Sequence, residues 1–397
     1  MTWRKLVNLP AVLSLFRKRS RPEFPPRVLF LTEGQTACSE LVTAPLIALA
    51  NQGKIQLTTL FEHDHRGRHL RRLARRQCDL LIVFRGSTRR GLKTLTAAKR
   101  AGKKTVWASD DDLLNLDSSN PVGGRYERSK VRTTIEDMMK TADTLWTFSE
   151  QMRRKYLEKG FQEVHYCHSI APFSDSAIQC TDDHHQGSDL IRIGHIGDFS
   201  HANEMHNLVS AIQVLSKVKL NRKWIFEFAG FTPPELENHP NVRSVPYIKG
   251  IDNFHKWLRS ASWSIGIAPL RDTPFNRCKT DNKFRTFSAN GIAGIYTKIP
   301  PYSDSVVHEH TGLLCDDSSE EYAECLKRLI EDDVLREHIK QQSQKIAMER
   351  YHPKAVATQY ESILCRLLKL PSLTSTSDQS YLMDNRVVER KTHKIGA

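Results

Sequence analysis

Long apolar runs, clustered cysteines and an excess of glycine or proline are all missing from this 397-residue chain. No apolar run approaches the ~20 residues that cross a bilayer, which excludes a membrane-spanning helix. The eight cysteines include no C-x-x-C pair, so a zinc or disulfide scaffold is excluded and a reducing, cytosolic setting is expected. Glycine and proline number 19 and 17, too few for a collagen-like or low-complexity chain. The length predicts two to three domains.

Acidic residues are scarce in the N-terminal third of the chain. Residues 66–104 contain 14 Lys/Arg and one acid, and residues 1–26 contain six Lys/Arg and one acid. These segments carry +13 and +5 of a formal charge of +14, which leaves −4 for the rest. A polybasic face favours an anionic bilayer, and the alternative is a solvated helix surface. Nucleic acid is not an expected partner, because no helix-turn-helix, RNP or zinc-finger pattern accompanies the charge.

Residues 1–26 are predicted to form a separate basic amphipathic segment. Apolar side chains such as Trp3 and Phe16 lie beside basic residues, including the run RKR at 17–19. This pattern is typical of a segment at the interface of an anionic membrane. The alternative is a frayed basic tail, since Pro10 breaks a continuous helix. The segment does not have the long apolar core and cleavage site of a secretory signal peptide.

From Arg27 onward, apolar strands alternate with amphipathic helices. The first series of predicted strands covers 27–34, 55–60, 79–84, 104–109, 144–149 and 164–169. The second series covers 191–197, 224–230, 242–248, 263–270, 293–299 and 311–315. Intervening helices of ordinary length predict βαβ units and parallel sheets.

The domain boundaries follow from this alternation. We expect an N-terminal Rossmann-like domain over 27–173, a polar linker over 174–189 and a C-terminal Rossmann-like domain over 190–350. A helical segment over 351–370 follows. The tail 371–397 is polar and Ser/Thr-rich, which predicts disorder.

The stretch GHIGDFSHANEM at 194–205 is predicted to be a strand, a glycine turn and the start of a helix. Backbone N–H groups at such a turn bind phosphate, which makes Gly197, Ser200 and His201 candidates. The alternative is an ordinary tight βα turn with a solvated histidine.

Two lysines in FNRCKTDNKFRTFSANG (275–291) are four residues apart. In one helix, Lys279 and Lys283 share a face, and their charges at its start oppose the helix dipole. A bound anion reverses that cost, and a solvated surface pair is the alternative.

Residues 190–350 resemble the nucleotide-sugar-binding domain of retaining GT-B glycosyltransferases of cell-surface polysaccharide synthesis. The matching stretches are GHIGDFSH, IAPLRDTPFNRCKTDNKF, PPYSDSVVHEHTGLLCDD and EEYAECLKRLIEDDVLREHI. The residues that fit the family pattern aPL-d-pFN-x-K-S-x-x-K are Pro269, Leu270, Phe275, Asn276, Lys279 and Lys283, with Thr280 in place of serine. The N-terminal half resembles the family more loosely, through DDDL (110–113) and TADTLWTFSEQMRRKY (141–156).

The resemblance implies an α/β GT-B fold: two Rossmann-like, doubly wound parallel-sheet domains, with the segment 351–370 crossing back to the first. It implies that the donor lies between the domains, without a metal ion or another cofactor. The implied donor-binding residues are Gly197, Ser200, His201, Asn276, Lys279, Thr280, Lys283 and Thr286. In the N-terminal domain, the loop after the first strand contributes Gly34.

Three acidic residues, Asp110, Asp111 and Asp112, follow the strand 104–109. Ligands sit at the carboxyl edge of open α/β sheets, and the resemblance implies that this loop lies near the sugar and the acceptor. We take the three as candidate catalytic residues, one of them orienting an acceptor hydroxyl. The alternative is that they cap a helix beginning at Leu113.

The sequence also departs from the family pattern. Cys278 and Thr286 stand where many relatives have two glutamates, the second of which contacts the ribose. Asp198 stands where an arginine often brackets the diphosphate. These replacements keep a second function open, that of a catalytically inactive GT-B scaffold in a membrane polysaccharide-synthesis complex.

The predicted function is that of a glycosyltransferase. It moves a sugar, with retention, from a nucleotide-sugar donor to a saccharide or lipid-linked acceptor. The expected location is cytoplasmic and peripheral, at the inner face of an anionic membrane.

Overall fold

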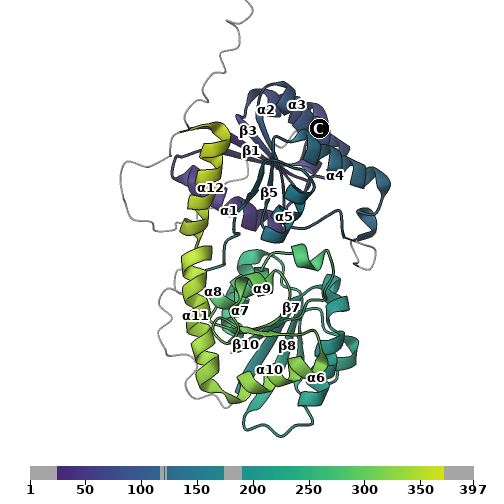
Figure 1. The fold of residues 1–397 in the computed structure, drawn as a ribbon, viewed down its shortest axis with the longest axis vertical. Coiled ribbons are helices and arrows are strands. Elements are labelled where there is room, and N and C mark those ends of the chain that lie inside the picture. The colour runs from purple at the N-terminus through teal and green to yellow at the C-terminus, as the bar shows by residue number, and fades with distance from the viewer. Residues whose placement is uncertain (1–24, 117–119, 121–122, 174–189, 371–397) are drawn as a thin grey trace, which may run out of the picture.

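The computed structural model describes residues 25–116, 120, 123–173 and 190–370. It contains two six-stranded sheets, one in the upper and one in the lower half of Figure 1, each flanked by helices. Neighbouring strands are parallel throughout both sheets. The predicted α/β, doubly wound architecture is confirmed.

The first sheet has the strand order β2-β1-β3-β4-β5-β6. Its strands are β1 (Arg27–Thr32), β2 (Gln56–Phe61), β3 (Leu80–Phe84), β4 (Lys104–Ser109), β5 (Thr144–Thr147) and β6 (Val164–Tyr166). Its helices are α1 (Ala37–Asn51), α2 (Gly67–Arg76), α3 (Arg89–Arg100), α4 (Ser129–Thr141) and α5 (Glu150–Glu158). All five residues of β3 are buried, because helices cover both faces of a parallel sheet.

The second sheet has the strand order β12-β11-β10-β7-β8-β9. Its strands are β7 (Leu190–Gly197), β8 (Lys223–Gly230), β9 (Val242–Val245), β10 (Ile265–Ala268), β11 (Ala293–Thr297) and β12 (Leu313–Cys315). Its helices are α6 (His206–Leu215), α7 (Ile251–Ala261), α8 (Asn282–Ala289), α9 (Tyr302–Ser305), α10 (Ser319–Glu331) and α11 (Asp333–Tyr351).

Each sheet has one point where the chain order reverses. In the first sheet this point lies between β1 and β3, and in the second between β7 and β10. Ligands of open α/β sheets bind outside the carboxyl ends of the strands at such switch points. We therefore expect a ligand site at the loops that follow these four strands.

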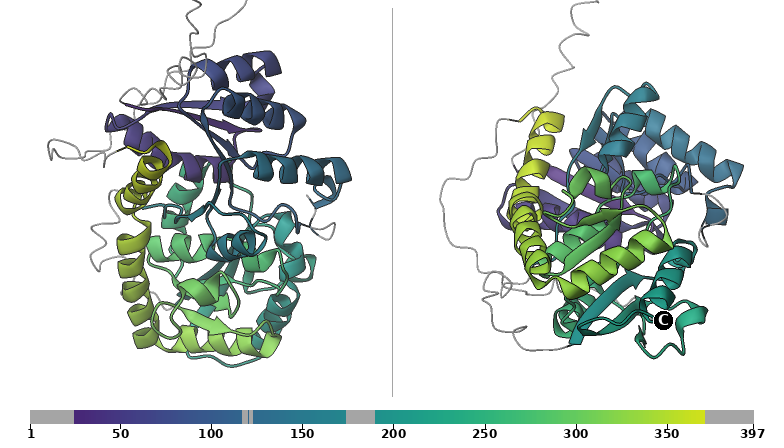
Figure 2. Two further views of the ribbon diagram at one scale, coloured as in Figure 1. Left: turned by 45° about the horizontal axis from the view of Figure 1, so that its top comes forward. Right: turned by 60° about the horizontal axis from the view of Figure 1, so that its bottom comes forward.

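The last helix, α12 (Pro353–Leu368), returns to the first sheet. In Figures 1 and 2, α11 runs beside the lower half and α12 beside the upper half. Buried Val356, Tyr360 and Leu364 share a core with Phe30 and Ile82 of the first sheet. The crossing helix is confirmed, and it ties the two halves together.

Some predicted elements differ in detail. The helix start expected at the end of 194–205 is instead a 3-10 turn at Phe199–Glu204, which α6 follows. The strand expected over 263–270 is shorter, because Pro269 has no N–H to donate to a neighbouring strand. The segments 1–24, 174–189 and 371–397, which hold the predicted linker, the tail and most of the basic segment, lie outside the described residues. The domain boundaries stay predictions.

Among the described residues, no helix combines the length and the apolar character that crossing a membrane requires.

Candidate functional site

Two glycines let the carboxyl ends of β7 and β8 come close together. Gly230 has a φ of +108°, and a Cβ there would lie 2.4 Å from the carbonyl oxygen of Gly197. The turn after Gly197 is closed by Asp198, whose Oδ1 accepts from the Ser200 amide at 2.9 Å and from its hydroxyl at 2.5 Å. Gly197 and Ser200 therefore shape the turn that was predicted to hold phosphate.

Lys283 lies beside this turn, near the carboxylates of Glu204 and Asp198 but without an ion-pair contact to either. It forms no hydrogen bond or ion pair with any described residue. Burial, together with the charge of Lys279, lowers the pKa of the Lys283 amine from 10.5 to about 8. Near neutral pH most of these amines are still charged, so a partly buried cation faces the turn.

His201 lies in the same turn, close to Lys283. The charge of Lys283, followed by burial, holds the pKa of His201 well below its usual 6.5. The imidazole is therefore neutral at pH 7 and has one N–H to donate and one nitrogen that accepts.

Lys279 and Lys283 were expected on one helix face, and this prediction was wrong. Lys279 follows the 3-10 turn Asn276–Cys278 in an extended conformation, and α8 begins only at Asn282. The two lysines nevertheless lie close enough to interact, since the charge of Lys279 lowers the pKa of the Lys283 amine. The chain bend, and not helical spacing, brings them together.

Glu204 is a buried carboxylate beside these lysines. Its Oε1 accepts from Asn276 Nδ2 at 3.1 Å and lies 4.0 Å from Lys279 Nζ. Its Oε2 is buried and has no hydrogen-bond partner among the described residues. Asn276 also donates to the Arg271 carbonyl at 2.9 Å, so this predicted donor-binding amide orients Glu204 and the loop after β10.

Thr280 and Thr286, the other predicted donor-binding residues of this region, lie on either side of a buried ion pair. Arg285 donates to Asp281 at 2.9 Å, to the Ile170 carbonyl at 2.6 Å and to the Thr280 hydroxyl at 3.4 Å. Thr286 is buried within α8. The ion pair anchors the start of α8, and with it the position of Lys283.

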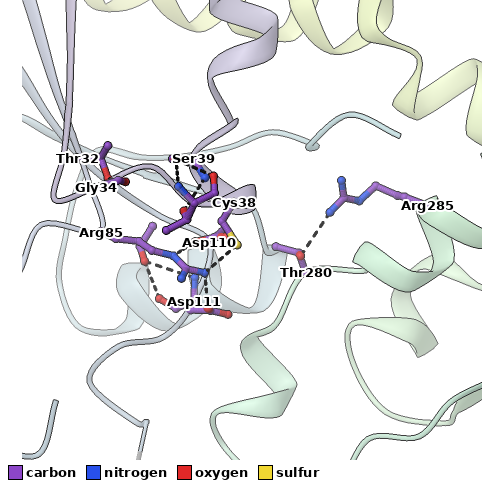
Figure 3. Close-up of polar contacts among 11 residues, drawn as sticks. Thr32, Gly34, Cys38, Ser39, Arg85, Asp110, Asp111, Thr280 and Arg285 are labelled. Atoms are coloured by element: carbon purple, nitrogen blue, oxygen red, sulfur yellow. Dashed lines mark hydrogen bonds and ion pairs between the residues drawn. The ribbon is translucent and has the colours of Figure 1, made fainter. Parts of the chain in front are cut away.

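At the switch point of the first sheet, an arginine holds two of the three predicted carboxylates. Arg85, directly after β3, has a φ of +48° and forms ion pairs with both Asp110 and Asp111. Its Nη2 also lies 3.4 Å from the Cys38 sulfur. Figure 3 shows Arg85 among these side chains, with Gly34 nearby in the loop after β1.

Burial dominates the electrostatics of this cluster. It raises the pKa of the Asp111 carboxyl, an effect that the charge of Arg85 opposes and that of Asp110 reinforces. Burial also raises the pKa of the Cys38 thiol. Asp111 is thus a carboxyl held in a fixed position with an increased affinity for a proton.

Asp112 has a different environment. It forms an ion pair with Lys155 of α5 and accepts from Asn115 Nδ2 at 2.7 Å. The segment that begins at Leu113 is a turn, so the helix expected there is absent and the capping alternative was wrong. Asp112 is held against α5, away from Arg85, which separates its role from that of Asp110 and Asp111.

The two switch points meet at one junction between the halves, formed by the loops after β1, β3 and β4 and those after β7 and β10. The charge of Lys279 acts on Asp111 across it. Cys278 packs into the core of the first sheet, and Gln151 Nε2 donates to Asp304 Oδ2 at 2.9 Å. Figure 3 shows the Arg85 cluster and Thr280 on opposite sides of this junction.

Sequence reasoning missed Arg85 and Glu204. Arg85 directly follows the apolar run LLIVF, and a charged residue at the end of a buried strand marks the carboxyl edge of a sheet. Glu204 had no such signal, because its partners lie about seventy residues further along the chain.

No protein-family model and no curated protein matches the chain. The solved structures similar to it include HepE from Anabaena in complex with UDP and glucose, at 14% identity, 86% of this chain, 100% of that chain and a TM-score of 0.61. They also include sucrose-phosphate synthase from Thermosynechococcus elongatus, at 12% identity, 87% of this chain, 99% of that chain and a TM-score of 0.58.

A third similar structure is the apo form of the lipopolysaccharide outer core galactosyltransferase WaaB, at 11% identity, 86% of this chain, 99% of that chain and a TM-score of 0.58. At these identities the likeness shows the fold. The chain has the GT-B arrangement of two facing Rossmann-like sheets.

The first prediction concerns Lys283. Replacing it by methionine removes a poorly solvated charge, so Lys283→Met should stabilise the ligand-free protein by about 1–2 kcal/mol near pH 7. The gain should shrink between pH 8 and 10.5, because the folded wild type releases its proton there before the unfolded chain does. Urea unfolding at several pH values measures it. Lys217→Met, at an exposed position, is the control, and an equal effect of both variants contradicts the assignment.

Proposed function

We propose that this chain is a glycosyltransferase that uses a nucleotide-sugar donor. The observation that carries the proposal is the unpaired, partly buried Lys283 beside Lys279 and the Gly197 turn, at the switch point of the second sheet. A buried cation without a counterion destabilises the free protein, and an anion bound there reverses that cost. A diphosphate supplies two or more negative charges in one group.

The donor side of the proposal assigns the diphosphate to the turn Gly197–His201, Lys279 and Lys283. The neutral His201 side chain donates a hydrogen bond to the diphosphate, while the lysines supply charge. The similar structure of HepE contains UDP and, in another crystal, UDP-glucose, which supports a nucleotide-sugar as the donor.

The chemistry assigned to this site is the breaking of the bond between the sugar C1 and the diphosphate oxygen. The electron pair of that bond leaves with the nucleoside diphosphate, whose added charge is neutralised by Lys279 and Lys283. The acceptor oxygen forms the new bond to C1 and loses its proton. We propose transfer with retention of configuration, and no step requires a metal ion or another cofactor.

The acceptor side of the proposal is the Arg85 cluster after β3 and β4. The fixed carboxylate of Asp111 orients the acceptor hydroxyl and draws its proton, for which its raised pKa suits it. Arg85, which also pairs with Asp110, holds Asp111 in place, and the Gly34 loop borders the same edge of the sheet. We propose a saccharide or lipid-linked acceptor in cell-surface polysaccharide synthesis.

We also propose that the chain works at the cytoplasmic face of an anionic membrane. Helices α2 and α3 carry most of the basic residues of segment 66–104, and Arg68, Arg72 and Arg76 of α2 are exposed. Each such charge contributes about 1 kcal/mol to the free energy of binding to an anionic membrane surface.

A second candidate function is an inactive GT-B scaffold in a membrane complex. It is favoured by Cys278 and Thr286, which stand at the positions of the glutamates of many relatives and are both buried. Donor turnover separates the two candidates.

The second prediction tests the donor site. Lys279→Ala should weaken nucleoside diphosphate binding ten- to a hundredfold, about 1.5–3 kcal/mol, because a charge-assisted hydrogen bond is lost. Calorimetry with UDP and GDP on the folded variant measures this. Lys217→Ala should bind like the wild type, and unchanged affinity in Lys279→Ala removes this residue from the donor site.

The third prediction separates enzyme from scaffold. With the right donor, the protein should slowly hydrolyse a nucleotide-sugar in the absence of an acceptor, and Asp111→Asn should reduce this rate at least tenfold. Chromatographic detection of the released nucleoside diphosphate over a donor panel measures it. Binding without hydrolysis, and no transfer with membrane extracts, establishes the scaffold function instead.

The fourth prediction concerns the membrane. The full chain should co-sediment with anionic vesicles and not with neutral ones, and the binding should fall as salt rises. The triple variant Arg68→Gln, Arg72→Gln, Arg76→Gln should bind at least tenfold more weakly. Equal binding to both kinds of vesicle, or to neither, refutes the membrane proposal.

A further inference from the structure

A groove of about 460 Å³ lies between α3 and α4 on the first half of the molecule. Both helices appear in the upper half of Figure 1, with α4 at its right-hand side. The groove is lined by Arg89, Leu92, Lys93, Ser129, Lys130, Thr133, Thr134 and Asp137. These residues are distinct from those of the junction, so the groove is a separate feature of the surface.

Three cations line this groove without partners. Arg89, Lys93 and Lys130 form no side-chain hydrogen bond or ion pair with any described residue. Two other cations of α3 do have partners: Arg90 donates to the Glu62 carbonyl at 2.6 Å, and Lys99 lies 3.4 Å from Asp143. The groove therefore gathers three positive charges that have no ion-pair partner among the described residues.

The polar groups of the groove suit a phosphate. The groove also contains one carboxylate, Asp137, which leaves a net charge of about +2. This charge is opposite in sign and similar in magnitude to that of a phosphomonoester at neutral pH. The hydroxyls of Ser129 and Thr133, at the edge of the same groove, have no partner among the described residues and are free to donate to phosphate oxygens. The volume lies within the 300–1,000 Å³ that is usual for small-ligand sites.

We propose that this groove binds a soluble, phosphate-bearing small molecule. The hollow shape favours a small ligand, since a flat bilayer reaches exposed charges such as those of α2 but does not fill a recess. The site lies outside the junction and does not depend on the proposed transferase activity. Arg89, Lys93 and Lys130 bind the phosphate oxygens, and Ser129 and Thr133 donate hydrogen bonds to them.

Calorimetry with inorganic pyrophosphate tests this site on the full chain. The measurement uses the double variant Lys279→Ala, Lys283→Met, in which the proposed donor site no longer binds anions. Pyrophosphate should still bind, and adding Arg89→Gln, Lys93→Gln and Lys130→Gln should weaken binding at least tenfold. Adding Arg68→Gln, Arg72→Gln and Arg76→Gln instead removes the same charge from α2 and should change the affinity less than twofold.

Several results overturn the proposal. These are the absence of pyrophosphate binding in the double variant, an equal loss with both triple substitutions, or a groove triple that weakens only vesicle binding. A second measurement does not need the variants to fold: pyrophosphate should slow acetylation of Lys93 and Lys130, but not that of exposed Lys140, in the wild-type protein. If pyrophosphate slows acetylation of all three lysines equally, or of none, the site is contradicted. Failure of UDP binding at the junction leaves these results unaffected, so the two proposals fail independently.

Discussion

Parallel pairing of every neighbouring strand is the constraint on which the site depends. Each βα connection of a parallel sheet leaves at the same edge, so the loops of one half all gather on one side. Here the loops after β1, β3 and β4 face those after β7 and β10, and the charge of Lys279 reaches Asp111 across the junction. Helix α12 keeps the halves in this relation, because Tyr360 and Leu364 belong to the core of the first sheet.

Within that frame, the ion pair of Arg285 and Asp281 fixes the cationic site. Burial alone raises the pKa of Asp281, but Arg285 and the hydroxyl of Tyr351 outweigh it and hold the carboxyl ionised. The same guanidinium donates to the Ile170 carbonyl of the first half. The start of α8 is thereby fixed relative to both halves, and Lys283 is held where it has no ion-pair partner among the described residues. The buried charge of Lys283 lowers the stability of the ligand-free protein, as is common for residues of ligand-binding sites.

The sequence predicted the strands well, because buried runs such as LLIVF leave little choice of structure. It also proposed Lys279, Lys283 and the Gly197 turn as donor-site residues, and that assignment stays a prediction, although it placed the two lysines wrongly in one helix. It did not distinguish Asp112 from Asp111, because the difference is made by Lys155, 43 residues away. Arg85 was missed for the same reason: its two carboxylate partners lie 25 and 26 residues further along the chain. Local sequence patterns do not reveal contacts between loops that are distant along the chain.

The central claim is that Lys283 is a poorly compensated cation that a nucleoside diphosphate neutralises. The most direct test is its pKa, measured by competitive acetylation and mass spectrometry over a range of pH, with and without saturating UDP or GDP. We expect a pKa of about 8 in the free protein and a rise of at least one unit when the nucleotide is bound, because the bound anion favours the charged amine. A value near 10.5 that the nucleotides leave unchanged would contradict it.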